Sequence, residues 1–475
     1  MKRDTMNISV TQRITLIALI ASLSSCSMSG KYIQPETGVP SSFRGEQSAQ
    51  QHPLHSSSTI GRLSYRTFFQ DPALLVLIES AIAHNSDLQL AMKNIDYASL
   101  TLRQAGLSGL PGFGLQGSAS SSGTSDYGSS PLSDGEESVE TFSASAYASW
   151  ELDIWGKIRS RKKSALAGYL ESVEAGKAVQ TRLVASVAEG YSTLQMLDTQ
   201  YAVTAQNLEL AATTLSMMRL QYDAGLVTSL AVDRQEALKL DAEAGLAKIE
   251  QQIALQENAL SVLCGRMPEG IERGAVRPMQ NRFSAGIPAA LLSNRPDVKA
   301  AELALMKAHA ETGVAAANLY PSLTISAEAG SEALKASDWF TFPGSLFSFV
   351  QGAVLQPIFQ QGTLRTAYKQ SQVVREEEEI RFRQAVLDAV REVSDALVTI
   401  DKLDVQQRAA EKQVALLQQS VTNAGLLFQG GMADYLDVIS AQSAALDAEL
   451  SLSDIRRQQR NAVTELYRAA GGGWQ

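Results

Sequence analysis

The chain has 475 residues, a net charge of −9 and an aromatic content of only 6%. A protein that binds nucleic acid is expected to present a basic face, so the acidic balance argues against nucleic acid as a partner. Alanine, leucine, glutamine, serine and glutamate are plentiful, which is typical of long helices packed through small side chains. The composition therefore indicates a mainly helical protein.

The N-terminus has the organisation of a bacterial secretory signal. A positively charged start is followed by an apolar run too short to span a bilayer, and then by small residues. The tetrapeptide Leu-Ser-Ser-Cys resembles a lipobox, in which the bond between Ser25 and Cys26 is cut and Cys26 is acylated. Ser27 replaces the aspartate that commonly retains lipoproteins at the inner membrane, which favours the outer membrane. A plain secretory signal with a chance cysteine remains the alternative.

The second half of the chain repeats the first. Matching residues are separated by 210 positions early in each copy and by 206 further on: Asp87 and Asp297, Pro111 and Pro321, Gly225 and Gly431, and Gly265 and Gly471. This period is far longer than the 20–50 residues of a solenoid repeat, so it indicates one module that has been copied. We expect six segments: a signal peptide at 1–25, a lipidated tether at 26–70, repeat 1 at 71–265, a linker at 266–294, repeat 2 at 295–471 and a tail at 472–475.

The positions of proline and glycine predict the helices. No proline occurs between Gly156 and Met267 or after Pro357, and because proline breaks helix interiors these windows permit very long helices. Apolar residues at three- and four-residue steps support a first helix of roughly 65 residues, about 100 Å long. Glycine turns end the long helices, since glycine adopts the positive φ of a helix C-cap. The expected helices are 72–106, 156–222, 229–263, 296–318, 363–428 and 434–470.

Alternating apolar and polar residues predict four strands. Every second residue from Phe142 to Ile154 is apolar, which gives a strand with one apolar and one polar face. Its partner is expected directly after Pro111. In the second copy we expect the apolar side of the third strand at Leu323, Ile325, Ala327 and Ala329, and that of the fourth, interrupted by Gln351, at Phe347, Phe349, Ala353 and Leu355.

Four strands cannot close on themselves, and open sheet edges in lipid cost several kcal/mol for each unpaired group. Either the strands lie outside the membrane or several chains complete one barrel. Three chains would supply twelve strands and four would supply sixteen, and both sizes are physically possible. Trp150, Trp155 and Trp339 lie near the expected strand ends, where interfacial aromatic residues are common.

The whole mature chain resembles a TolC-like outer-membrane efflux factor, of the lipoprotein branch that partners RND-type pumps. The residues that carry the resemblance are Cys26, the strand entries at Pro111 and Pro321, the string Trp-Glu-Leu-Asp-Ile-Trp-Gly-Lys at 150–157, and the two glycine turns. The resemblance implies a homotrimer with a twelve-stranded outer-membrane β-barrel and a long periplasmic α-barrel that narrows to a gated tip. It also implies a periplasmic adaptor protein and an inner-membrane pump as partners.

The resemblance also suggests residues for the gate. Related channels place rings of carboxylates and bulky apolar residues after the second glycine turn, where this chain has Asp434, Leu436 and Asp437. Ser440 stands where a further aspartate is common, and Ala231 is the counterpart of Asp437 after the first turn. We therefore expect one acidic ring and a leucine constriction. The simpler interpretation of Asp434 is that it caps the returning helix.

The two turns also predict a docking surface. In the family that the chain resembles, small residues at the tips would leave room for the helical ends of an adaptor protein. This chain has Gly225, Gly430 and Gly431 at its tips. Turn geometry alone explains the same glycines, so this interpretation rests on the resemblance.

Signatures of catalysis and metal binding are weak. Gly112–Gly117 matches the dinucleotide fingerprint but precedes a strand rather than a helix. The four histidines do not group into a metal site, and Cys264 is expected to be a small core residue. The acidic run 376–379 is interpreted as a solvated helix face, with an acidic channel lining as the alternative. We expect no enzyme activity, no metal and no cofactor.

The favoured function is a passive outer-membrane duct that expels drugs or other small molecules delivered by a pump and its adaptor. One alternative is the same architecture serving protein secretion. A second alternative is a lipid-anchored coiled-coil scaffold without a pore, which would have no need of the two-faced strand at 142–154.

Overall fold

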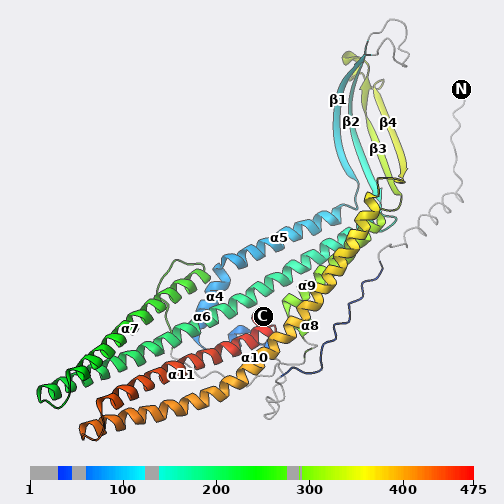
Figure 1. Ribbon diagram of the computed structural model, residues 1–475. Helices are drawn as coiled ribbons and strands as arrows, with labels where there is room; N and C mark the ends of the chain where they lie inside the picture. The colour runs from blue at the N-terminus through cyan, green and yellow to red at the C-terminus, as the bar shows by residue number, and fades with distance from the viewer. Residues whose placement is uncertain (1–29, 45–59, 124–137, 275–287, 289–290) are drawn as a thin grey trace, which may run out of the picture. The chain divides into compact units, whose positions relative to one another are not determined.

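The structure is a computed structural model that describes residues 30–44, 60–123, 138–274, 288 and 291–475. Its strands and principal helices are labelled in Figure 1. The helices are α3 (Tyr65–Phe68), α4 (Pro72–His84), α5 (Ser86–Leu107), α6 (Lys157–Asp223), α7 (Ser229–Leu263), α8 (Leu291–Asn294), α9 (Pro296–Ala317), α10 (Thr363–Gln429) and α11 (Tyr435–Ala469). The strands are β1 (Gly112–Gly123), β2 (Ser138–Leu152), β3 (Ser322–Ala333) and β4 (Leu346–Leu355).

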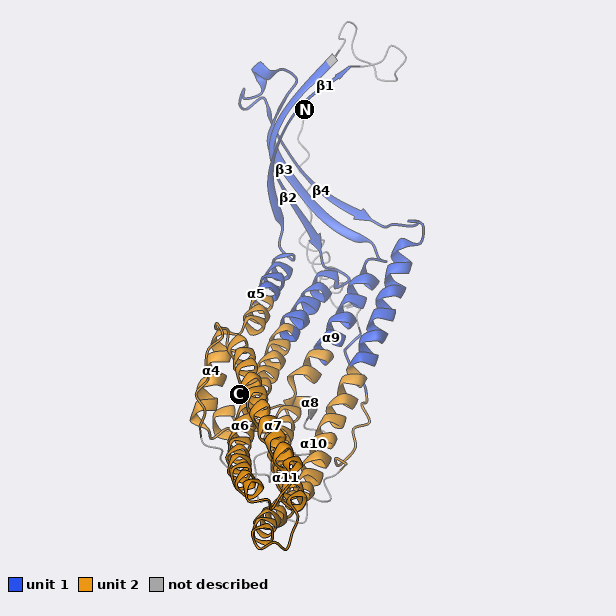
Figure 2. Cartoon of the chain, turned by 60° about the vertical axis from the view of Figure 1, so that its left-hand side comes forward, with its two compact units in different colours: residues 1–35, 96–171, 302–381 blue, residues 36–95, 172–301, 382–475 orange. Residues whose placement is uncertain are grey.

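Two compact units share the chain (Figure 2). The first contains the whole sheet and the helical segments that adjoin it, from residues 1–35, 96–171 and 302–381. The second contains the long helical hairpins, from residues 36–95, 172–301 and 382–475. Among the described helices, none combines the length and the apolar character needed to cross a membrane.

The duplication appears as helices of equal length. The long helices α6 and α10 both have 67 residues, and the returning helices α7 and α11 both have 35. Five of the six expected helices are confirmed to within one or two residues, because proline-free windows and terminal glycines mark their ends.

The expected single helix at 72–106 is instead two helices, α4 and α5, separated at Asn85. The backbone of Asn85 is extended, with ψ of 127°. Its Oδ1 accepts the N–H of Leu88 at 3.0 Å, which starts α5, and its Nδ2 donates to the carbonyl of Leu263 at 3.0 Å. Asparagine is a preferred helix N-cap. Its side chain therefore begins a new helix at this position, where one continuous helix was expected.

All four long helices end in the same hydrogen-bond pattern. At the end of α6 the N–H of Leu226 donates to Gln221 and the N–H of Gly225 donates to Tyr222. The ends of α7, α10 and α11 repeat this arrangement. The glycines that occupy the left-handed position, with φ between 68° and 92°, are Gly225, Gly265, Gly431 and Gly471. This is the Schellman termination, which favours glycine because the residue has no Cβ.

Two of these glycines also contact a neighbouring helix end, and the contact is the same in both repeats. A Cβ on Gly265 would lie 2.3 Å from the carbonyl oxygen of His84, and a Cβ on Gly471 would lie 2.6 Å from that of Asn294. His84 and Asn294 are themselves related by the offset of 210. The close approach of two helix ends is therefore a duplicated feature of the fold.

The sheet is antiparallel throughout, in the order β1-β2-β3-β4, so β1 and β4 are its edges. Ala146 of β2 lies opposite Leu115 of β1 and Ala329 of β3. Directly paired residues share a face, so the predicted apolar sides of β2 and β3 coincide. This part of the strand prediction is confirmed.

The predicted apolar side of β4 is wrong. Phe349 pairs with Glu328, which pairs with Tyr147, so this phenylalanine lies on the polar face. The apolar face of β4 instead contains Val350, opposite Ala327. Both alternating residue sets of β4 are largely apolar, so its own periodicity cannot decide between them. The residues misplaced by the prediction are Phe347, Phe349, Ala353 and Leu355.

Candidate functional site at the helical tips and on the sheet

The second tip begins α11 with a reciprocal cap made by two aspartates. Oδ1 of Asp434 accepts the N–H of Tyr435 at 2.6 Å, and Oδ2 of Asp437 accepts the N–H of Asp434 at 3.0 Å. The Asp434 side chain also accepts from the backbone of Asp437, which completes a capping box. Both carboxylates therefore stabilise the helix start, although sequence reasoning assigned a cap to Asp434 alone.

The tips of the two repeats differ chemically. Leu436 is 42% exposed beside the capping box, and the neighbouring Met432 is 75% exposed. In the first repeat Ala231 stands in place of Asp437 and is fully buried. Thr228 begins α7 there without a side-chain hydrogen bond. Within the described residues, the paired carboxylates are thus a feature of the second tip, and Met432 is an exposed tip residue that sequence reasoning missed.

The tip glycines stand in open space. No atom lies within 4 Å of a Cβ built on Gly225 or Gly431, and both have φ close to 70°. Gly430 is less open, since its nearest neighbours are 3.4 Å away. Glycine is required at Gly225 and Gly431 by backbone conformation rather than by crowding.

Buried amides hold the returning helices near their tips. Nε2 of Gln235 donates to the carbonyl of Ala211 at 3.1 Å, which joins α7 to α6. Nε2 of Gln442 donates to Oγ1 of Thr214 at 3.1 Å, which joins α11 of one hairpin to α6 of the other. The two glutamines are 0% and 5% exposed. The bond between Gln442 and Thr214 thus links the two hairpins, and the sequence carries no signal for it.

One face of the sheet carries a network of polar side chains. Oε1 of Glu328 accepts hydrogen bonds from Nε2 of Gln116 at 2.8 Å and from Oγ of Ser145 at 2.5 Å. The hydroxyls of Ser118 and Ser143 are 2.8 Å apart on the same face. Neutral donors hold the Glu328 carboxylate in place, and this face matches the polar lining expected of a water-filled barrel.

The dinucleotide fingerprint lies inside strand β1. A Cβ on Gly114 would lie 2.5 Å from the ring of Tyr147 on β2. Gly114 is therefore explained by the space that a tyrosine ring on the polar face needs. The run Gly112–Gly117 pairs with β2 along its whole length, in place of the phosphate-binding turn that the motif requires.

Aromatic residues gather at both ends of the sheet. At the end next to the helices, Nε1 of Trp150 donates to Gly109 at 3.0 Å and Nε1 of Trp155 donates to Pro321 at 2.7 Å. At the opposite end the Trp339 ring lies 5.7 Å from that of Phe142. Phe142 and Trp150 are eight residues apart on β2, or about 26 Å. In a strand tilted by about 40° this length corresponds to a height of about 20 Å, a little less than the apolar band of roughly 25 Å in outer-membrane barrels.

Exposed apolar side chains also follow the last strand. Ile358 is 95% exposed and Phe359 is 84% exposed, between the end of β4 and the start of α10. Both residues were overlooked in the sequence, where they form no alternating or helical pattern.

The acidic run inside α10 is divided between solvent and ion pairs. Glu376 and Glu377 are exposed, whereas Glu378 and Glu379 are half-buried. Arg381 pairs with Glu378 and lies 3.7 Å from Glu377. The expectation that at least two of these carboxylates face solvent is met.

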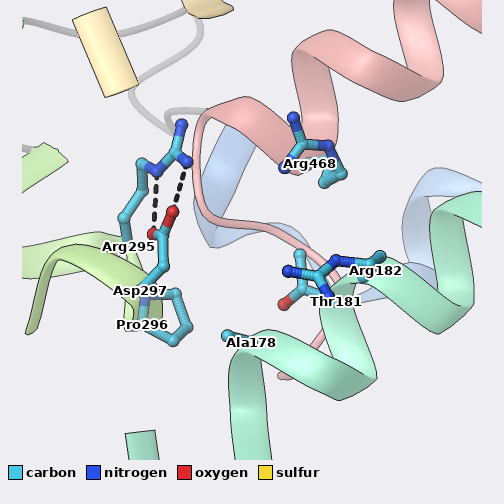
Figure 3. A pocket seen from close by; sticks show the side chains of 7 residues that line it. All are labelled: Ala178, Thr181, Arg182, Arg295, Pro296, Asp297 and Arg468. Carbon is cyan, nitrogen blue, oxygen red and sulfur yellow. Dashed lines mark hydrogen bonds and ion pairs between the residues drawn. The ribbon is translucent and has the colours of Figure 1, made fainter. Parts of the chain in front are cut away.

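A buried arginine, whose pairing with Asp297 is drawn in Figure 3, joins three helices of the second repeat. Arg295 precedes α9, pairs with Asp297, contacts Glu392 of α10 at 2.8 Å and donates to the carbonyl of Ala469 at 3.1 Å. Burial alone would raise the pKa of Asp297, but the Arg295 guanidinium outweighs it and lowers this pKa. Arg295 and Asp297 line a cavity of about 30 Å³ together with Arg468, which is room for about one water molecule.

Of the two cysteines in the sequence, Cys264 is the one that lies among the described residues. Cys264 is 1% exposed, and burial raises the pKa of its thiol, as fits a core residue. Ser25 and Cys26 lie outside the described residues. The part of the chain that the structure describes contains no group of three or more histidine, cysteine, aspartate or glutamate side chains arranged to hold a metal ion.

A two-faced sheet with free edges, joined to long hairpins with exposed tips, is the architecture of a channel subunit. The model of the family described as "Outer membrane efflux protein" matches residues 77–266 and 287–472, and the chain belongs to this family. It is 27% identical over 456 residues to the cation efflux system protein CusC of Escherichia coli O6:H1, covering 95% of this chain and 97% of that one. It is 29% identical over 465 residues to the toluene efflux pump outer membrane protein TtgC of Pseudomonas putida, covering 95% and 93%.

Solved structures agree with this assignment. A crystal structure of CusC superposes with a TM-score of 0.84 at 26% identity and covers 94% of this chain and all of that one. The open state of the MtrE outer membrane channel of Neisseria gonorrhoeae gives a TM-score of 0.82 at 25% identity, with coverage of 95% and 99%. The predicted fold, a trimeric α-barrel and β-barrel channel of the outer membrane with a long periplasmic portion, is confirmed. The protein is an outer-membrane efflux channel.

Proposed function

We propose that this protein is the passive exit duct of a tripartite efflux system. It acts as a homotrimer that docks with a periplasmic adaptor and an inner-membrane RND-type pump, and it has no catalytic residue or cofactor of its own. The observation that carries the proposal is the four-stranded sheet with two free edges and one polar face. Such a sheet is complete only when other copies close it into a water-filled barrel.

The substrates are proposed as a class. The names of the relatives refer to cations for CusC, toluene for TtgC and antibiotics for ArpC of Pseudomonas putida. Channels of one family thus serve very different substrates, so the pump discriminates between substrates more than the channel does. The proposed substrates are therefore small molecules as a class. Deletion of the gene should raise susceptibility to at least one drug, solvent or metal in a panel. Unchanged susceptibility to the whole panel, in cells lacking other channels of this family, would contradict the proposal.

The proposed gate is the second tip, with Asp437 and Asp434 as its carboxylates and Leu436 as its constriction. Asp437 has two separable properties, a charge and a hydrogen bond that ties down the start of α11. Small residues at Gly225, Gly430 and Gly431 are proposed to receive the adaptor. The open space around Gly225 and Gly431 supports this assignment.

The gate makes a testable prediction in lipid bilayers. The intact channel should conduct poorly, and Asp437→Ala should raise the conductance because it removes both the side chain at the constriction and the capping bond. Asp437→Asn keeps an acceptor oxygen, so it should leave the conductance close to that of the original protein while weakening the preference for cations. Conductance recorded at symmetric salt and reversal potential recorded across a salt gradient separate the two effects. An original channel already open, and unchanged by Asp437→Ala, would remove Asp437 from the gate.

The lipid anchor is proposed at Cys26, after cleavage of residues 1–25, with 26–70 as the tether. The first described part of the tether contacts α9, where Nε2 of His309 lies 2.9 Å from the carbonyl of Gly30. The four residues from Cys26 to Gly30 span at most about 14 Å. The proposed anchor therefore lies within that reach of His309, which limits its distance from α9.

Acylation gives a direct check on the anchor. Cys26→Ser should abolish incorporation of labelled palmitate and leave the signal peptide uncleaved by the lipoprotein peptidase. The matched control is Cys264→Ser, which alters the buried cysteine and should leave labelling unchanged. Labelling that persists in Cys26→Ser would remove the anchor from this position.

A further inference from the structure

Both long helices begin with basic residues that the channel function does not explain. Neither α6 nor α10 has an acidic residue in its first turn. Instead the first two turns present a set of cations that we call the basic collar: Arg161, Lys162 and Lys163 of α6, and Arg365 and Lys369 of α10.

The collar is partly duplicated between the repeats. Lys163 and Lys369 are related by the offset of 206, as are Arg159 and Arg365. Arg159 is not counted in the collar, because it pairs with Asp153 at 3.1 Å. Two positions four residues apart thus carry a cation at the start of each long helix, on one helix face.

The five collar residues are all exposed, and no ion pair joins any of them to a carboxylate among the residues that the structure describes. The helix dipole favours anions at a helix start and acts mainly within the first turn, so it offers these cations no stabilisation. Their placement therefore does not stabilise the helices, and an external anionic partner accounts for it better.

The collar lies directly beyond the membrane-facing sheet, within the same compact unit (Figure 2). Trp155 precedes α6, and the exposed Ile358 and Phe359 precede α10, so apolar side chains lead into the cations in both repeats. Lys163 and Lys369 are about 9 Å along their helices from the first residue. Helical side chains tilt toward the helix N-terminus, which here is the side of the sheet. These positions match the headgroup layer of a bilayer.

Helical geometry ensures that part of the collar faces outward. Arg161, Lys162 and Lys163 are consecutive, and three consecutive helical positions span about 200° around the axis. At least one of these cations therefore points away from the lumen, whichever way α6 is turned.

We infer that the basic collar binds the anionic headgroups of phospholipids in the periplasm-facing leaflet of the outer membrane. The inference rests on the proposed function, which places the sheet in that membrane. Cations near a charged bilayer are attracted to its phosphates, and each adds to the affinity. The collar would thus fix the depth of the channel and anchor the starts of the long helices that lead to the tips.

The test compares two variants with the same change of charge. The collar variant combines Lys162→Gln, Lys163→Gln and Lys369→Gln. The control combines Arg234→Gln, Lys248→Gln and Lys412→Gln, which are exposed cations of the long hairpins without an ion pair among the described residues. The solubilised protein is titrated with phosphatidylglycerol, with phosphatidylcholine and with inorganic phosphate, and thermal stability reports binding.

Phosphatidylglycerol should stabilise the original protein and the control alike, and the collar variant should need at least about tenfold more lipid. Equal stabilisation by phosphatidylcholine or by inorganic phosphate, or an equal loss in the control, would overturn the inference. A collar variant that still binds lipid but changes the ion selectivity of the pore would also overturn the inference, because the collar cations would then face the lumen. Failure of every protein to conduct in bilayers would count against the proposed function, whereas the lipid titration would still be decisive for the collar.

Discussion

Replacing Arg295 by alanine should lower the free energy of unfolding by about 3 kcal/mol, among the largest effects expected of a single change in this chain. The side chain is 3% exposed and bonds to α9, α10 and the end of α11 at once. This loss is at the lower end of the range expected when one partner of a buried ion pair is removed. Asp297 is half-exposed, and Glu392 still pairs with Arg468 at 3.0 Å after the change. Denaturant unfolding of the solubilised protein, followed by helical circular dichroism, measures the change.

The duplication supplies a sharper comparison at the same position. In the first repeat Asn85 stands in place of Arg295, and its amide donates to the carbonyl of Leu263, the counterpart of Ala469. Arg295→Asn should therefore recover part of the stability that Arg295→Ala loses. Arg391→Ala removes an exposed arginine with two long ion pairs and should cost less than about 1 kcal/mol. If Arg295→Ala proved as mild as Arg391→Ala, the cluster would have no structural importance.

Acid should weaken the same cluster. The pKa of Asp297 is lower in the folded protein than in the unfolded chain, so its pairing contributes stability at neutral pH. That contribution starts to fall as the pH drops below the ordinary aspartate pKa of about 4, and it is lost on passing the lower folded value. The difference in stability between the original protein and Arg295→Ala should shrink over the same acidic range.

Gly265→Ala should destabilise the fold by several kcal/mol, and Gly225→Ala by only about 1 kcal/mol. The two glycines have φ of 68° and 70° and end their helices in the same way. They differ in surroundings, since a Cβ on Gly265 would meet the carbonyl oxygen of His84 at 2.3 Å while one on Gly225 meets nothing within 4 Å. The backbone penalty is thus common to both variants, and their difference measures the steric contact.

The second repeat offers a similar comparison, with φ of 92° at Gly471 and 69° at Gly431. Gly471→Ala should behave like Gly265→Ala, because its Cβ would meet Asn294, and Gly431→Ala should behave like Gly225→Ala. Thermal unfolding of all four variants provides the measurement. Equal losses of stability in all four variants would show that the positive φ alone causes the loss. The close approach of the helix ends would then be unimportant for stability.

The sequence predicts the helices well because their signals are local. Long proline-free windows and a glycine at each left-handed position define α6, α7, α10 and α11 with little help from the rest of the chain. The break at Asn85 is less visible, since one of the two hydrogen bonds of its side chain goes to Leu263, 178 residues away in the chain. The face of β4 needs the register of β3, because both sides of the strand are apolar.

The candidate site is predicted less completely than the fold. Asp434, Leu436 and Asp437 are proposed from the family resemblance and their distance from Gly431, but the bond from the Asp434 N–H to the Asp437 carboxylate depends on how the turn folds. Gln442 and Thr214, which join two hairpins, are 228 residues apart in the chain. Contacts of this range leave no periodic pattern, so only the folded structure reveals them.

The free edges of β1 and β4 have a genetic consequence. Each subunit contributes its own strands to the barrel. A single defective subunit therefore leaves a gap in the barrel that the other two subunits cannot close. When equal amounts of sound and defective chains assemble at random, only about one trimer in eight contains three sound copies. Mutations that spoil the sheet but spare assembly should therefore be dominant over the intact gene.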